Sequence, residues 1–258
     1  MRTNWVRQKL KAGEPTVGAQ MGLGSPNVAE LMAQAGYDWL VIETEHNGLD
    51  SAQVEHMLMA MNGTDTIPIA RVPSADPVFI QKALDVGALG ILVPMVRTAS
   101  EAEAIVSATR YPPEGTRGFG PLRASRYTMD NDDYFARANE NILVALILET
   151  REAIENLAEI AAVPGVDVLL FGLFDLCISM GLNPMHMPFP EIDAAIEKGL
   201  AVGREQPDVA IGIGAGTPED LCHRLDQGFT FATYGTDYQL LGDTVRAGLE
   251  AFRTHTKR

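Results

Sequence analysis

Eight short apolar runs, separated by amphipathic stretches, constrain the fold of this chain more than any other feature of its sequence. They recur about every 20 to 35 residues, a spacing typical of strand-then-helix units rather than of hairpins. The runs cover residues 16–21, 39–43, 67–72, 90–95, 142–149, 168–172, 209–214 and 229–234.

Helix-start residues precede the amphipathic stretches between these runs. They are Ser25 with Pro26, Ser51, Asp76 with Pro77, Ser100, and Thr217 with Pro218, ahead of residues 28–35, 54–61, 79–86, 102–109 and 221–227. Eight such units in 258 residues predict an α/β fold, a (β/α)8 TIM barrel forming one domain over residues 1–258. The alternative is an open doubly wound sheet, but residues 22–26 match its Gly-rich nucleotide turn only in part.

Two carboxylates, Glu149 and Asp175, stand at the ends of apolar runs that are typical of fully buried strands. If those strands are parallel neighbours, the two side chains can share one divalent cation. Hard oxygen ligands favour Mg²⁺ or Mn²⁺ over a structural zinc ion. The other interpretation is structural: Glu149 opens the following helix and Asp175 caps one.

Other polar residues also follow strands, among them Glu43, Glu45, His46, Arg71 and Asp237. His46 is a candidate general base, although a histidine after a strand is also common as a hydrogen-bonded turn residue. The guanidinium of Arg71 needs an anionic partner, because burying it alone would be costly. That partner is Glu43, Glu45 or a substrate oxyanion.

The chain is acidic, with a formal net charge of −14. This charge argues against nucleic acid and anionic membranes as partners, because it would repel both. An acidic protein that binds an anionic small molecule must concentrate its few cations locally. Two scattered cysteines, and a beginning without an apolar signal stretch, favour a cytoplasmic location.

Two kinds of covalent catalysis are disfavoured. The lysines Lys9, Lys11, Lys82, Lys198 and Lys257 fall at the termini or in helical patterns, so none is placed to form a Schiff base at a strand end. No Gly-x-Ser-x-Gly turn occurs, which disfavours a serine nucleophile. The Gly- and Pro-rich segment 111–129 is either a lid or binding loop, or a plain exposed connection.

The order of several motifs resembles the HpcH/HpaI family of class II pyruvate aldolases, which includes the 4-hydroxy-2-oxoheptanedioate aldolases. The resemblance extends over about residues 5–250. Its motifs are Glu43-Thr44-Glu45-His46, Ala70-Arg71-Val72-Pro73, the segment 82–88, Val93-Pro94-Met95-Val96, Tyr111-Pro112-Pro113 to Arg117-Gly118, Leu148-Glu149-Thr150, and Phe171-Gly172 to Asp175-Leu176.

The resemblance implies a divalent metal, Mg²⁺, Mn²⁺ or Co²⁺, held by Glu149 and Asp175. It implies that His46 acts as the base, that Asp85 orients it, and that Arg71 holds the keto oxygen of the substrate and its enolate. The expected reaction is reversible cleavage of a 4-hydroxy-2-oxo acid to pyruvate, or a close analogue, and an aldehyde.

The resemblance also implies how substrate is bound and how the protein assembles. The backbone amides of Gly172, Leu173 and Phe174 receive the substrate carboxylate, the loop from Arg123 to Ser125 closes over it, and Glu43 completes the pocket. Family members assemble as homo-oligomers, hexamers built from trimers, with active sites near subunit contacts.

This sequence departs from the family pattern around the substrate. Glu43 is one methylene longer than the usual aspartate, Ile147 replaces a glutamine, and the segment 172–175 replaces a Gly-Pro-Ala-Asp type turn. Two alternatives therefore stay open. One is an enolate enzyme acting on oxaloacetate, either a decarboxylase or an enzyme similar to citryl lyases or macrophomate synthase. The other is a keto-acid-binding regulatory barrel, which would not need His46 and Asp85.

Overall fold

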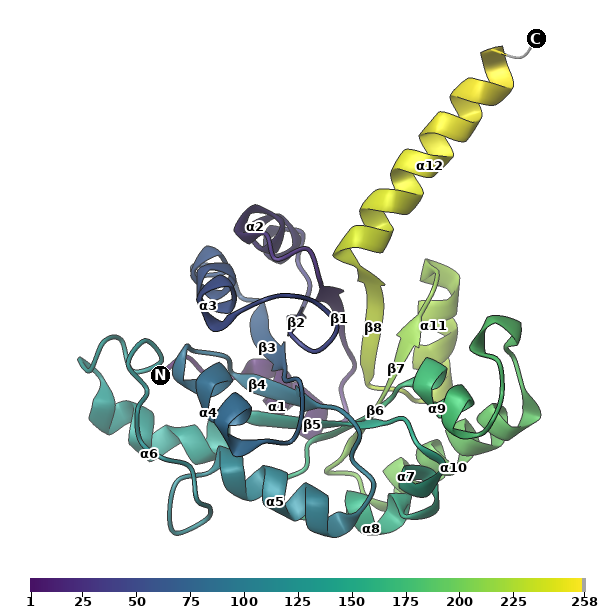
Figure 1. The fold of residues 1–258 in the computed structure, drawn as a ribbon. Helices are drawn as coiled ribbons and strands as arrows, with labels where there is room; N and C mark the ends of the chain where they lie inside the picture. Colours follow the sequence, from purple (N-terminus) through teal and green to yellow (C-terminus); the bar gives the residue numbers. More distant parts are fainter. Residues whose placement is uncertain (257–258) are drawn as a thin grey trace.

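The eight apolar runs form eight parallel strands that pair in sequence order into one closed barrel (Figure 1). This computed structural model describes residues 1–256, so Lys257 lies outside the described residues. The strands are β1 (Thr16–Met21), β2 (Trp39–Glu43), β3 (Ile67–Arg71), β4 (Gly90–Val93), β5 (Leu143–Leu148), β6 (Val168–Phe171), β7 (Ala210–Ala215) and β8 (Phe231–Thr236). The predicted TIM barrel is confirmed, and each strand begins within two residues of its expected position.

Helices surround the barrel, and the predicted helical stretches are confirmed. They are α1 (Trp5–Lys11), α2 (Pro26–Gln34), α3 (Ser51–Ala60), α4 (Pro77–Asp85), α5 (Ala99–Thr109), α6 (Asn131–Asn141), α7 (Arg151–Glu155), α8 (Leu157–Ala161), α9 (Leu173–Ser179), the 3-10 turn η1 (Pro184–His186), α10 (Pro190–Glu205), α11 (Pro218–Gln227) and α12 (Asp237–Thr256). Within residues 1–256, no helix combines the length and apolar character needed to cross a bilayer.

Two predicted helix starts are wrong by one or two residues. Asp50, not Ser51, caps α3 in a reciprocal capping box with Gln53. Thr98, not Ser100, caps α5 in the same arrangement with Glu101. In both cases the residue three positions after the true cap has a side chain long enough to bond back to the cap amide, and serine inside the first turn cannot provide that second bond.

A stacked aromatic pair fills the barrel interior at the end where the strands begin. The rings of Trp39 and Phe231 lie parallel with centroids 3.9 Å apart, and both side chains are fully buried. Gly18 on β1 makes room for this pair, because a Cβ atom there would lie 2.1 Å from the Trp39 ring and 2.4 Å from the Trp39 carbonyl oxygen.

The last helix, α12, projects away from the barrel instead of packing along it (Figure 1). Its side chains Tyr238, Leu241, Val245, Leu249 and Phe252 recur every three or four residues and are between 47% and 63% exposed. Helix α11, the neighbour of β8, buries none of its residues. The chain therefore carries an apolar helical stripe that it does not cover by itself.

Gly18→Ala is expected to destabilise the fold by about 1 to 3 kcal/mol, because the added methyl group overpacks the Trp39 layer. Urea unfolding measures the change in the free energy of unfolding. Gly214→Ala is the matched control, since Gly214 also lies in a strand and a Cβ atom placed there would have no atom within 4 Å. Equal stability of the two variants would contradict the packing argument.

Candidate active site

Charged side chains gather at the carboxyl ends of β2, β3, β5 and β6. Glu43 ends β2 and Arg71 ends β3, and both are buried. Glu149 follows β5, and Asp175 lies in the first turn of α9 after β6. Because all strands are parallel, these ends meet at one rim of the barrel, which is where active sites of this fold form.

Arg71 is the central cation of this rim. Its Nη1 donates to Glu43 Oε2 at 3.0 Å, its Nη2 forms an ion pair with Glu45 Oε2, and the same Nη2 lies 3.9 Å from Glu149 Oε2. Arg71 therefore pairs with both of the glutamates expected as its partner, Glu43 and Glu45.

Glu43 also shapes the turn that follows β2. Its Oε1 accepts the backbone N–H groups of Glu45 at 2.6 Å and His46 at 3.1 Å. One carboxylate thus holds both the turn and the guanidinium of Arg71. The extra methylene of Glu43, noted as a departure from the family pattern, belongs to the side chain that makes all three contacts.

Glu149 is held by a backbone amide that the sequence did not indicate. The N–H of Met95 donates to Glu149 Oε1 at 2.5 Å, and Met95 adopts a left-handed φ of 58° after Pro94. Burial raises the pKa of Glu149, while the Met95 amide and Arg71 act in the opposite direction. The effect of burial on this pKa is the largest of the three.

Gly172 has no side chain and therefore leaves space for the side chain of Glu149. A Cβ atom at Gly172 would lie 2.9 Å from Glu149 Oε2 and 2.9 Å from Ile147 Cγ2. Asp175 is close enough to raise the pKa of Glu149 through its charge. Glu149 and Asp175 line the same cavity, and two such carboxylates fit a cation such as Mg²⁺ or Mn²⁺ that takes its remaining ligands from water and substrate.

The predicted carboxylate-binding amides are only partly available. The N–H of Gly172 donates to Leu148 O at 3.1 Å and belongs to the end of the sheet. Leu173 and Phe174 begin α9, where N–H groups have no acceptor within the helix. Two residues that differ from the family pattern lie at this rim. Ile147 is buried in its interior, and Phe174 is exposed at its surface.

His46 lies at the same rim with 60% of its side chain exposed. Its Nε2 is 3.4 Å from Glu45 Oε2, so Glu45 joins the histidine to Arg71. Burial raises the pKa of Glu45 as the largest effect, and the charges of Arg71 and His46 lower it. The sequence indicated Glu45 as one possible partner of Arg71, but it did not indicate the contact of Glu45 with His46.

Asp85 does not meet His46 within one chain. It is the last residue of α4, next to the beginning of β4, and its Oδ1 accepts from Arg117 Nη2 at 2.7 Å. A barrel helix returns the chain from the carboxyl rim to the start of the next strand, so Asp85 and His46 lie at opposite ends. The four residues of β4 alone span about 13 Å.

Ser125 lies near Asp85, at the end of the barrel opposite to Glu149 and Asp175. It is buried, its hydroxyl donates to Pro121 O, and the neighbouring Ala124 N–H donates to Asp85 O at 3.2 Å. Asp237, the other strand-end acid, is also occupied: its two oxygens accept the N–H groups of Gly22 and Leu23 at 2.9 and 3.0 Å, which fixes the loop after β1.

A parallel eight-stranded barrel with paired acids and an anchored arginine at its carboxyl rim defines a class of protein, an enzyme of the TIM-barrel type that stabilises developing negative charge. The sequence profile of the HpcH/HpaI aldolase/citrate lyase family matches residues 20–243, and the chain belongs to this family. It is therefore a lyase.

Similar proteins are known by sequence and by structure. A 2-dehydro-3,6-dideoxy-6-sulfogluconate aldolase of Pseudomonas putida is 40% identical over 236 residues, with 90% of each chain covered. A 4-hydroxy-2-oxo-heptane-1,7-dioate aldolase of Shigella sonnei is 41% identical over 252 residues, covering 95% of this chain and 93% of the relative. A crystal structure of a family member from Burkholderia cenocepacia superposes with a TM-score of 0.92 at 34% identity, covering 97% of this chain and all of that one.

Gly172→Ala is expected to weaken Mn²⁺ binding about tenfold or more, because the added methyl group pushes Glu149 out of place, and tenfold corresponds to ~1.4 kcal/mol. Isothermal titration with Mn²⁺ measures the affinity without any substrate. Gly48→Ala is the control, since Gly48 also lies near the rim and its added methyl group would meet no atom within 4 Å. Unchanged Mn²⁺ affinity in the Gly172 variant would rule out this position for the cation.

Proposed function

We propose that this chain is a metal-dependent aldolase that reversibly cleaves a 4-hydroxy-2-oxo acid to pyruvate, or a close analogue, and an aldehyde through an enolate. The observation that carries the proposal is the cluster of Glu149, Asp175 and the anchored Arg71 at one barrel rim. The aldolase names of two relatives at about 40% identity support it.

Glu149 and Asp175 would hold the metal, Mg²⁺ or Mn²⁺ in the first place and Co²⁺ as a further candidate. When bound, the cation supplies positive charge that stabilises the enolate of a 2-oxo acid. Gly172 keeps the Glu149 carboxylate in place for this role, and the Met95 amide fixes which of its oxygens stays free.

Arg71 binds the keto oxygen of the substrate in this proposal. Its guanidinium is held by Glu43 and Glu45, so it need not reorganise as negative charge builds up on that oxygen. The carboxylate of the substrate lies against the free amides of Leu173 and Phe174. Glu43 contributes to substrate binding by holding Arg71 and the turn before His46.

His46 is the proposed base that removes the proton from the C4 hydroxyl group while the C3–C4 bond breaks. Its exposed side chain is accessible to a substrate, and Glu45 lies close enough to its Nε2 to stabilise the charged ring after proton transfer. The electron pair of the broken bond passes into the enolate, and protonation at C3 then gives pyruvate.

A second copy of the chain is needed to bring Asp85 to His46. The Oδ1 atom of Asp85 is fixed by Arg117, whose side chain is fully buried, whereas Asp85 itself keeps 18% of its side chain exposed. We propose a homo-oligomer, a trimer or a hexamer built from trimers, in which Asp85 and the Ser125 loop of one chain complete the rim of the next. The uncovered apolar stripe of α12 supports assembly.

We also propose a cytoplasmic location, because both cysteines are free thiols.

Removal of divalent metal with EDTA is expected to abolish pyruvate release from a panel of 4-hydroxy-2-oxo acids, and added Mg²⁺ or Mn²⁺ to restore it. Coupled reduction of pyruvate by lactate dehydrogenase measures the rate. Glu149→Gln is expected to lose Mn²⁺ binding, whereas Glu159→Gln on the exposed face of α8 keeps both binding and activity. Full cleavage in EDTA would remove the metal from the mechanism.

His46→Ala and Asp85→Asn are each expected to slow cleavage about 100-fold or more, the contribution of a positioned base. Both are expected to leave Mn²⁺ binding intact. If Asp85 acts across a subunit contact, unfolding and refolding an equal mixture of the two variants restores activity, because about a quarter of the sites then combine intact His46 with intact Asp85.

The mixture also provides its own control. Refolding either variant alone produces no site with both residues intact and gives no recovery. An inactive mixture, with each variant inactive alone and the oligomer re-formed as judged by light scattering, would show that Asp85 does not act across a subunit contact.

A further inference from the structure

The family motif at residues 111–118 lies beside Asp85, at the end of the barrel where the strands begin. The segment follows α5 and packs back against the end of that helix. The backbone N–H of Arg117 donates to Arg110 O at 2.9 Å. This contact fixes the backbone position from which the side chain of Arg117 reaches α4.

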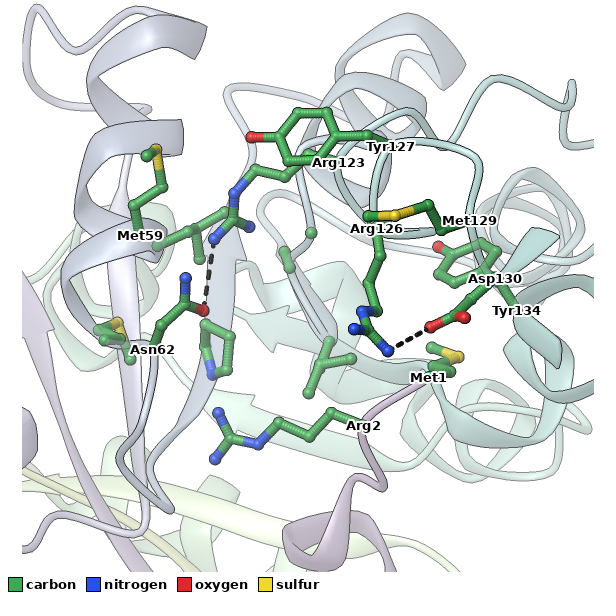
Figure 2. Close-up of a pocket in the computed structure, with 17 residues that line it drawn as sticks. Met1, Arg2, Met59, Asn62, Arg123, Arg126, Tyr127, Met129, Asp130 and Tyr134 are labelled. Atoms are coloured by element: carbon green, nitrogen blue, oxygen red, sulfur yellow. Dashed lines mark hydrogen bonds and ion pairs between the residues drawn. The ribbon is translucent and has the colours of Figure 1, made fainter.

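The guanidinium of Arg117 lies between two aromatic rings. Its Cζ atom is 4.7 Å from the centroid of the Tyr111 ring and 5.7 Å from the centroid of the Tyr134 ring. Both tyrosines are buried, and the side chain of Arg117 has no exposed surface. Tyr134 also lines a cavity beside the segment 123–130, where Figure 2 labels it. The two rings attract the cation and restrict how its plane can turn.

Asp85 is the one anion that faces this buried cation. Arg117 Nη2 donates to Asp85 Oδ1 at 2.7 Å and to the Tyr134 hydroxyl at 3.1 Å, whereas its Nε and Nη1 atoms have no hydrogen-bond partner within residues 1–256. Burial raises the pKa of Tyr111 and of Tyr134, so both phenols stay uncharged. Burying a guanidinium with unpaired donors is costly, and the contact with Asp85 is the charged interaction that offsets this cost.

The loop that follows Arg117 holds the backbone around Asp85 as well. The N–H of Ala124 donates to Asp85 O at 3.2 Å, and Arg123 Nη1 donates to Val86 O at 2.7 Å. Arg123 Nη2 also donates to Asn62 Oδ1 at 3.5 Å, a contact drawn in Figure 2. The end of α4 is therefore fixed through both its main chain and the side chain of its last residue.

The second carboxylate oxygen of Asp85 stays available. Asp85 Oδ2 accepts no hydrogen bond from the described part of the chain, and 18% of the Asp85 side chain is exposed. Gly120 leaves the approach to this atom open, because a Cβ atom at Gly120 would lie 3.3 Å from Oδ2. One oxygen is thus held by Arg117, and the other is directed outward.

We propose that Arg117 is a positioning residue of the aldolase reaction. It holds Asp85 so that Oδ2 accepts a hydrogen bond from the ring of His46 of the partner subunit. This inference rests on the proposed function, in which Asp85 orients His46 across a subunit contact. A carboxylate that orients a histidine base must keep one direction, because it fixes the ring and stabilises its charged form after proton transfer. Arg117 also keeps a cation beside Asp85 when the contact removes the carboxylate from water.

Arg117→Met is expected to slow pyruvate release about tenfold or more, because a displaced carboxylate misplaces the base. Methionine keeps an unbranched side chain between the two rings but provides neither charge nor donor. Mn²⁺ affinity, measured by isothermal titration, is expected to stay unchanged. Arg117→Lys keeps the charge and one donor and is expected to recover part of the rate. Arg110→Met is the matched control, because Arg110 is also buried but donates to Thr109 Oγ1 and not to a carboxylate.

A double-mutant cycle shows whether Arg117 acts through Asp85. Added to Asp85→Asn, Arg117→Met is expected to cause no further loss of rate, because the carboxylate that it positions is already absent. Refolding Arg117→Met with His46→Ala is expected to restore activity in about a quarter of the sites, which combine intact His46 with an intact Arg117 and Asp85 pair. Refolding Arg117→Met with Asp85→Asn restores none, because every site then lacks one member of that pair.

An equal loss of rate from Arg117→Met with and without the Asp85 carboxylate would overturn the inference, since Arg117 would then act only on the fold. The same loss in Arg110→Met would also overturn it. These outcomes require that the unchanged protein cleaves a 4-hydroxy-2-oxo acid, so they contradict the role of Arg117 alone. Absence of cleavage by the unchanged protein would contradict the proposed function and, with it, this inference.

Discussion

The buried contact of Arg71 with Glu43 and Glu45 is the interaction on which the rest of the active rim depends. It satisfies a guanidinium that would otherwise be costly to bury, and it fixes two carboxylates that would otherwise repel each other and Glu149. Glu43 extends the same contact into the backbone of the turn that carries His46. Removing one member would leave a buried charge without a partner, so the four side chains form a single unit rather than four separate ligands.

The chain divides its candidate residues between two ends of the barrel. One end gathers Glu43, Glu45 and Glu149 around Arg71, and the other holds the ion pair of Arg117 with Asp85. A helix that returns from one rim to the other carries Asp85 away from the histidine it is expected to orient. Such a separation is informative in a homo-oligomer, because identical chains can meet head to tail and place opposite ends together.

Most of the fold, and about half of the rim, could be predicted from the sequence. Strand positions follow from runs of Val, Ile and Leu, and strand-end residues such as Arg71 and Glu149 follow from the rule that parallel strands end together. Two kinds of information were missing. The first is the contact of Glu149 with the backbone amide of Met95, because the sequence does not indicate that Met95 adopts a left-handed conformation. Asp85 was expected near His46 because a family pattern states which residues act together, but not from which chain they come.

In the proposed oligomer, the projecting α12 makes the stability of one chain depend on the presence of others. An apolar stripe left in water weakens the isolated barrel, and covering it in an assembly adds free energy that depends on protein concentration. Thermal stability measured on this protein is then a property of the solution as well as of the sequence, and dilution acts on it as a mild denaturant.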